Sequence, residues 1–156
     1  MPFDNPQDIA LMEAALAEAR TAQAEGEVPV GAVVVLQGRI IARAHNRPIA
    51  LSDPTAHAEL LALRMAGSAL NAYRLTGATI YVTLEPCTMC IGAMVNARIA
   101  RLKFGARDPK AGAAGSIYDI GRDGRLNHRM EIYPGLLEAQ CAELISHFFS
   151  ARRGRS

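Results

Sequence analysis

Residues 78–104, ATIYVTLEPCTMCIGAMVNARIARLKF, predict a strand, a helix and a second strand in succession. Residues 78–83 and 99–104 are short runs dominated by apolar side chains, which is typical of buried strands. Pro86 can open a helix that runs to about residue 96 between them, because proline fits the first helical turn. Strands that alternate with helices are typical of the α/β class, so this unit predicts an α/β fold.

The residues before this unit predict a helix and a β-hairpin. Apolar side chains recur every three or four positions over residues 5–26, which is the pattern of an amphipathic helix that Asp4 or Asn5 can cap. Two apolar runs, at residues 30–36 and 39–44, flank a Gln-Gly turn signal and predict the hairpin.

A loop and a second helix are predicted between the hairpin and residue 78. Residues 46–55 contain two prolines and predict the loop. Asp53 as a cap and Pro54 at the first helical position would then begin a helix that runs to about residue 66.

The C-terminal third predicts a long loop, a short strand and a last helix. Residues 105–124 are rich in Gly, Ala, Asp and Arg, and a connection of this length is usually functional. Residues 130–133 predict the strand, and Pro134 would open the helix. Its apolar positions at helical spacing are Leu137, Cys141, Leu144, Ile145 and Phe148.

Length and composition predict one ordinary globular domain. The chain has 156 residues, of which 50% are hydrophobic and 21% charged, and its net charge of +2 neither requires nor excludes a nucleic acid partner. We predict a single domain over residues 1–156, with a core over about 5–150 and a basic C-terminal tail at 151–156. The longest apolar run, residues 28–36, is far shorter than the roughly 18 residues of a membrane-spanning helix, so no span is predicted.

Cysteine usage and the N-terminal residues predict a cytoplasmic protein with reduced thiols. The first residues lack the basic and apolar segments of a secretory signal. Three cysteines are an odd number and too few for a disulfide scaffold at this length, so they are predicted to be core residues or metal ligands.

Two short motifs, HAE at residues 57–59 and PCTMC at residues 86–90, form the densest group of metal-ligand residue types. Cys87 and Cys90 are three positions apart and share one face of a helical turn, whose N-terminus favours thiolates. Together with His57 they offer the donor atoms that zinc prefers. Three protein ligands leave the fourth tetrahedral position open to water, as a catalytic zinc site requires.

Glu59 lies two residues from His57, about 200° around an ideal helix, so both can face one site only at the mouth of the helix. A carboxylate beside a zinc-activated water can accept its proton, so Glu59 is predicted to transfer protons rather than to bind the metal. The combination of His-x-Glu with Pro-Cys-x-x-Cys is the signature of the zinc-dependent nucleobase deaminases.

Other interpretations exist for the remaining candidate residues. Redox chemistry at Cys-x-x-Cys needs a thioredoxin-like context, which the HAE motif does not supply. A structural zinc site needs a fourth ligand, whereas Cys141 lies on an apolar helical face and is predicted to pack in the core. The remaining histidines, His45, His128 and His147, lack ligand spacing and are not assigned to the metal.

Two aromatic and two basic residues near the C-terminus have two interpretations. Phe148 and Phe149 can pack in the core or in a dimer interface. Alternatively, together with Arg152 and Arg153, they can stack on an unpaired nucleotide and attract its phosphates.

The chain resembles the cytidine and deoxycytidylate deaminase superfamily and, within it, the bacterial tRNA-specific adenosine deaminases. The matching segments, in order, are VPVGAV at 28–33, NRPI at 46–49, DPTAHAE at 53–59, YVTLEPC at 81–87, FGARD at 104–108, GAAGS at 112–116 and NHR at 127–129. The resemblance covers about residues 9–153, and its later segments favour the tRNA enzymes over free-base relatives.

This resemblance implies a three-layer α/β/α fold around a five-stranded mixed sheet, formed by a single zinc-dependent deaminase domain. It implies a homodimer with one zinc ion per subunit that hydrolyses adenosine to inosine at the wobble position of a tRNA anticodon stem-loop. Zinc would be held by His57, Cys87 and Cys90, and Glu59 would transfer protons. Nucleotide contacts are implied at Asn46, the Ala58 backbone, Asp108 and Lys110 in the 108–116 loop, and Phe148, Phe149, Arg152 and Arg153 on the last helix.

Two other functions remain open at the level of sequence. A free nucleobase or nucleoside deaminase, acting for example on guanine or cytosine, would use the same metal chemistry without a nucleic-acid platform. A non-catalytic zinc-binding module would hold the ion with four protein ligands.

Overall fold

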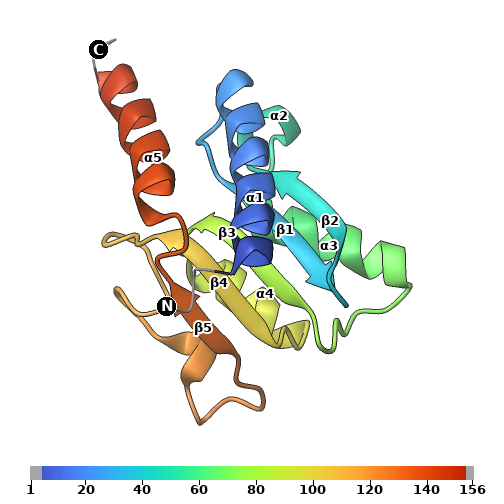
Figure 1. The fold of residues 1–156 in the computed structure, drawn as a ribbon. Helices are drawn as coiled ribbons and strands as arrows, with labels where there is room; N and C mark the ends of the chain where they lie inside the picture. Colours follow the sequence, from blue (N-terminus) through green and yellow to red (C-terminus); the bar gives the residue numbers. More distant parts are fainter. Residues whose placement is uncertain (1–4, 154–156) are drawn as a thin grey trace.

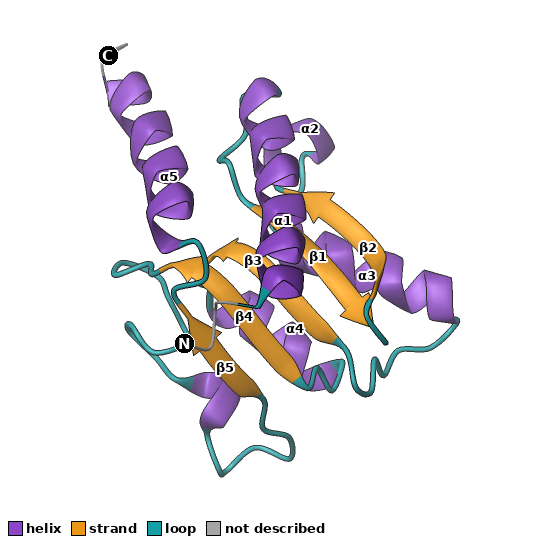
Figure 2. Ribbon diagram, viewed as in Figure 1, coloured by secondary structure: helices purple, strands orange, loops and turns teal. Residues whose placement is uncertain are grey.

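A computed structural model describes residues 5–153 as a five-stranded sheet between two layers of helices (Figures 1 and 2). The elements are α1 (Pro6–Ala24), β1 (Gly31–Leu36), β2 (Arg39–His45), α2 (Pro48–Leu51), α3 (Ala58–Leu70), β3 (Thr79–Leu84), α4 (Thr88–Asn96), β4 (Arg101–Ala106), the 3₁₀ turn η1 (Ile120–Arg122), β5 (Glu131–Pro134) and α5 (Glu138–Arg153). The strand order is β2-β1-β3-β4-β5, with β1 antiparallel to both neighbours and β3, β4 and β5 parallel. The predicted α/β class, five strands and three layers are confirmed.

The two faces of the sheet carry separate parts of the core. Helices α1 and α5 cover one face, and α3 and α4 cover the other (Figure 2). Along β1, Val33 and Val35 pack in the α1 layer, whereas Val34 packs in the opposite layer, because successive strand residues point to opposite faces. Cys141 is buried in the α1 layer, which confirms the prediction of a core thiol.

Close packing of α1 on the sheet depends on a glycine at the start of β1. A Cβ atom on Gly31 would lie 2.0 Å from the carbonyl oxygen of Ala15. Helix α1 begins one residue later than predicted, and the Asn5 side chain caps it by accepting a hydrogen bond from the Gln7 amide at 2.8 Å. Asp4, the alternative cap, lies outside the described residues.

The predicted start of the second long helix at Pro54 is wrong. The Asp53 side chain accepts hydrogen bonds from the Thr55 amide at 2.8 Å and from its hydroxyl at 2.7 Å, which closes a turn before any helix begins. Helix α3 therefore starts after His57 and extends to Leu70. The predicted loop over residues 46–55 is also corrected, because it contains the short helix α2.

The last helix begins later than predicted. Pro134 ends the edge strand β5, where the missing N–H of proline is tolerated, and so does not open α5. Gly135 and Leu137 adopt positive φ angles of 91° and 51°, which turn the chain before α5 begins at Glu138. Helix α5 continues to Arg153, so residues 151–153 of the predicted tail are helical and residues 154–156 lie outside the described part.

The predicted long loop after residue 104 first completes β4 and then contains η1 but no long helix or strand. Across residues 5–153, the structure has no helix with the length and apolar character needed to cross a bilayer.

Candidate active site

The carboxyl ends of three strands lie at one edge of the sheet. Strands β2 and β3 are each antiparallel to β1, and β4 is parallel to β3, so all three end at the same edge. From this edge the chain continues into α2 and α3, into α4, and into the loop that follows β4. Ligand sites of open α/β sheets lie outside the carboxyl ends of the strands, so this edge is the expected position of a functional site.

Two helix starts bring the three predicted zinc ligands together at this edge. His57 is the N-cap of α3, Cys87 is the N-cap of α4, and Cys90 lies in the first turn of α4. His57 Nδ1 lies 3.6 Å from Cys87 Sγ and 3.5 Å from Cys90 Sγ. One ligand atom from each residue lies within 4.8 Å of the other two, and no fourth Cys, His, Asp or Glu joins this group within residues 5–153.

This donor set fits zinc. Two sulfurs and one imidazole nitrogen are ligand types that zinc prefers, and a site with three protein ligands keeps a position for water. The chemistry of these donors therefore indicates a zinc site.

The two ligand thiols share one negative charge. The hydrogen bond from the Cys90 thiol, with His57 nearby, lowers the pKa of Cys87 to about 3. The same contact with Cys87, together with burial, raises the pKa of Cys90. Hydrogen bonding to Cys87 also raises the pKa of His57. The cluster therefore holds a thiolate at neutral pH, and a bound cation would favour ionisation of the second sulfur.

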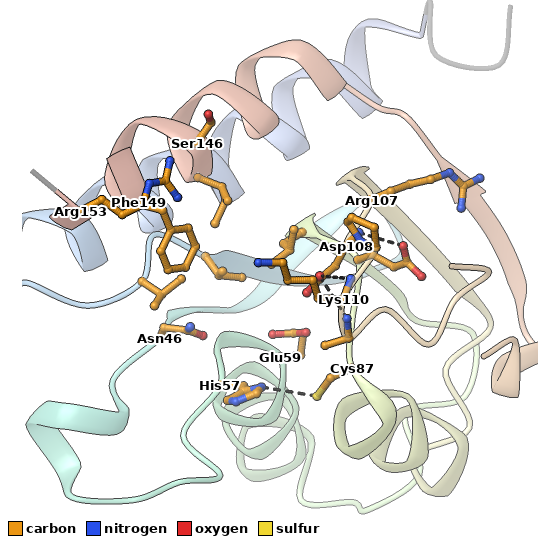
Figure 3. Close-up of a pocket in the computed structure, with 17 residues that line it drawn as sticks. Asn46, His57, Glu59, Cys87, Arg107, Asp108, Lys110, Ser146, Phe149 and Arg153 are labelled. Atoms are coloured by element: carbon orange, nitrogen blue, oxygen red, sulfur yellow. Dashed lines mark hydrogen bonds between the residues drawn. The ribbon is translucent and has the colours of Figure 1, made fainter. Parts of the chain in front are cut away.

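Glu59 lies beside these ligands, in the first turn of α3, with 4% of its surface exposed. Burial raises the pKa of Glu59 to about 7, so its carboxyl group can accept and release a proton near neutral pH. Both His57 and Glu59 line one cavity because His57 caps the helix rather than belonging to it (Figure 3).

The cavity above the ligands has a volume of about 570 Å³, within the range of small-molecule sites. The predicted site residues that line it are Asn46, His57, Glu59, Cys87, Asp108, Lys110, Phe149 and Arg153 (Figure 3). Asn46 Oδ1 accepts a hydrogen bond from the Ala58 amide at 2.8 Å, which leaves the Asn46 NH₂ group as a donor to the cavity. Ala58 itself is fully buried, and its amide hydrogen is used by Asn46.

The two aromatic residues and the two arginines predicted to bind nucleotides lie at different positions around α5, and only one residue of each pair lines the cavity. Phe149 is 40% exposed and lines the cavity. Phe148 is 8% exposed, and its ring packs edge to face against the ring of Phe149. Arg153 lines the cavity, whereas Arg152 lies over the Phe148 ring at 4.7 Å and donates to the Gly26 carbonyl at 3.2 Å. Of each pair, one residue lines the cavity and the other does not: Phe148 is buried, and Arg152 is exposed beside it.

Several cavity residues were not assigned from the sequence. Arg107 and Glu85 lie inside the quoted motifs, and a charged residue directly before PCTMC was an available signal for Glu85. The apolar lining residues Val28, Val30, Leu84 and Ile145 carry no signal that distinguishes them from core residues.

Three metal ligands would leave one coordination position of zinc open to water, and the buried carboxyl group of Glu59 lies next to these ligands. This site therefore defines the class of the protein as a zinc-dependent hydrolase. The chain belongs to the cytidine and deoxycytidylate deaminase family, whose zinc-binding region matches residues 5–106.

Individual proteins that are similar to this chain include tRNA-specific and free-base deaminases. The chain is 47% identical to a tRNA-specific adenosine deaminase of Bacillus subtilis over 94% of its own length and 91% of that protein. A structure solved in a study of A-to-I editing by tRNA:A34 deaminases at the wobble position of transfer RNA matches with a TM-score of 0.84 and 52% identity, over 86% of this chain and 98% of that one. A guanine deaminase from Nitrosomonas europaea matches with a TM-score of 0.78 and 26% identity, over 94% and 85% of the two chains.

Proposed function

We propose that this protein hydrolyses adenosine to inosine at the wobble position of a tRNA anticodon, with release of ammonia. The observation that carries the proposal is the position of α5, because Phe149 and Arg153 line the same cavity as His57, Glu59 and Cys87. An aromatic ring and a cation beside a nucleobase site are the groups that bind an unpaired nucleotide. The names of the relatives with 47% and 52% identity support the same substrate.

His57, Cys87 and Cys90 would hold the zinc ion, which supplies Lewis acidity that lowers the pKa of a water molecule. Glu59 accepts a proton from the attacking water and delivers it to N1 of adenine. The water oxygen bonds to C6 and becomes a hydroxyl group there. Glu59 then takes the proton of this hydroxyl group and passes it to the amino group, so that the C6–N bond breaks, ammonia leaves and C6 keeps a carbonyl oxygen. A single carboxyl group with a pKa of about 7 suits both transfers.

The remaining cavity residues would bind and orient the nucleotide. The Asn46 NH₂ group donates to the bound nucleoside, and the Ala58 backbone, whose amide donates to Asn46 Oδ1, helps to seat the base edge. Asp108 and Lys110 contact the flanking nucleotides from one side of the cavity, and α5 contacts them from the other. Phe149 stacks on a base while Phe148 supports it from below, and Arg152 and Arg153 attract phosphates through their charges.

The proposal includes a homodimer, a single domain and a cytoplasmic location. Exposed apolar side chains of α2 and α3, Ile49, Leu51 and Met65, offer a surface for a second copy of the chain. One domain over residues 1–156 would carry both the metal site and the RNA contacts. The unpaired thiols Cys87 and Cys90 and a tRNA substrate both favour the cytoplasm, where thiols stay reduced.

The substrate is tested by comparing inosine formation in an arginine anticodon hairpin with adenosine at the wobble position, the same hairpin with cytidine there, and free adenosine. We expect product from the first substrate alone, because an unpaired loop base costs little to extrude and its neighbours supply binding contacts. Ammonia release from free nucleosides or guanine, with no reaction on the hairpin, would favour a free-base deaminase. No reaction on any substrate, with zinc held by four protein ligands, would favour a non-catalytic module.

Replacing Arg153 with alanine should weaken hairpin binding and reduce the slope of log affinity against log salt concentration by about 1. Arg153 lines the cavity, where its charge would displace one counterion from the RNA. Binding titrations at several salt concentrations measure this slope. Arg39→Ala is the matched control, because Arg39 is an exposed arginine at the start of β2, on the edge of the sheet opposite the site. Equal slopes for Arg153→Ala and the wild type would contradict the phosphate contact.

A further inference from the structure

Glu85 is a buried carboxylate at the cavity that the mechanism above does not use. It lines the cavity with only 2% of its surface exposed, directly after β3 and two residues before the ligand Cys87. Its own amide donates to the Ala106 carbonyl at 2.8 Å, so the backbone of Glu85 is fixed at the ends of β3 and β4. A buried carboxylate is costly unless hydrogen-bond donors satisfy it, so its partners indicate its role.

Four donors from a single loop satisfy both oxygens of the Glu85 carboxylate. Oε1 accepts from the Asp108 amide at 3.0 Å and from the Ser116 hydroxyl at 2.5 Å. Oε2 accepts from the amides of Ala114 and Ser116, each at 3.0 Å. An ionised carboxylate only accepts hydrogen bonds, whereas an amide would present an NH₂ donor to one pair of these donors. The loop over residues 108–116 therefore folds around one charged group.

A glycine lets the loop contact this carboxylate closely. A Cβ atom on Gly112 would lie 2.3 Å from both Cδ and Oε2 of Glu85 and 2.6 Å from the Asp108 carbonyl oxygen. The next residue, Ala113, donates its amide hydrogen to the Pro86 carbonyl at 2.8 Å. Contacts with Glu85 and Pro86 thus fix how the loop lies against the segment that carries Cys87.

We infer that Glu85 is a positioning residue that holds the 108–116 loop over the metal site, so that Asp108 and Lys110 reach the substrate. The inference rests on the proposed function, in which these two residues contact nucleotides beside the target base. Glu85 is joined to Cys87 through one proline, so the loop and the metal site share a rigid anchor. Contacts that bind substrate and transition state alike affect KM more than kcat, and the loop contacts are of this kind.

The test is Glu85→Gln, which keeps the shape of the side chain but turns a donor group towards the loop. We expect KM for the adenosine hairpin to rise by about tenfold and kcat to fall by less than about threefold, with zinc content unchanged. Without substrate, hydrogen exchange should show faster exchange at the amides of Asp108, Ala114 and Ser116, while the amides of α3 and α4 stay protected.

Two further variants separate loop position from general destabilisation. Gly112→Ala keeps the Glu85 carboxylate chemically intact but puts a Cβ atom against it, so the loop and the carboxylate must move apart, and the variant should raise KM and amide exchange as Glu85→Gln does. Asp8→Asn removes another buried carboxylate, bonded to the Tyr81 hydroxyl and to Lys103 in the α1 layer, and should leave KM unchanged.

The inference is overturned if Glu85→Gln leaves KM and loop exchange unchanged, or if zinc is lost together with activity. The second result would make Glu85 a support for Cys87 instead of for the loop. A wild-type protein inactive on the hairpin would defeat the proposed function. The exchange measurement would then still support or overturn the hold of Glu85 on the loop, because it needs no substrate.

Discussion

Replacing Glu59 with alanine should lower kcat by about 10²- to 10⁴-fold, which is the usual contribution of a positioned general acid and base. Glu59 is the buried carboxyl group beside the metal ligands, and its pKa of about 7 suits proton transfer in both directions. The zinc content should stay close to one ion per chain, because His57, Cys87 and Cys90 remain in place. Inosine formation in the hairpin and elemental analysis of the same preparation measure the two quantities.

Stability separates this effect from misfolding. Because burial opposes ionisation of Glu59, its removal should leave the melting temperature unchanged or higher. Glu59→Gln keeps the shape of the side chain, accepts no proton and should be as inactive as Glu59→Ala. Glu143→Ala removes an exposed carboxylate from α5 and serves as the matched control with wild-type activity. If zinc and activity disappear together in Glu59→Ala, Glu59 is a ligand and its assignment to proton transfer is wrong.

Replacing Cys87 with alanine should abolish both zinc binding and turnover. Loss of an outer-shell partner alone typically costs 10- to 100-fold in metal affinity, so loss of a direct ligand should cost at least about 100-fold. Because zinc binds the folded protein, its loss should also lower the melting temperature. Elemental analysis, thermal unfolding with and without added zinc, and hairpin deamination provide the three readouts.

Cys141→Ala is the matched control for Cys87→Ala. Cys141 is a buried cysteine in the α1 layer, outside the ligand group, so its variant should keep zinc and activity despite some loss of packing. In the wild type, a chelator should remove activity and added zinc should restore it, whereas Cys87→Ala should not recover. Retention of stoichiometric zinc by Cys87→Ala would contradict the proposed ligand set.

Helix boundaries show where sequence patterns were insufficient. Proline fits a first helical turn, but Pro54 lies in the turn that Asp53 closes, and Pro134 completes an edge strand. At Pro54 a side-chain hydrogen bond, and at Pro134 strand pairing, outweighed the preference of proline for the first turn of a helix. The displacement of α3 has a functional consequence, because it makes His57 a helix cap and lets Glu59 face the same cavity.

The sequence alone determined the α/β class, the five strands and the three residues that we propose as metal ligands, because strand periodicity and ligand spacing are local properties of the chain. Tertiary structure decided which member of each C-terminal pair faces the cavity, since the register of α5 on the sheet turns Phe149 and Arg153 inward and buries Phe148. It also decided the role inferred for Glu85, whose four partners come from residues 23 to 31 positions away. Contacts between distant segments depend on how the whole sheet assembles, and no local pattern encodes them.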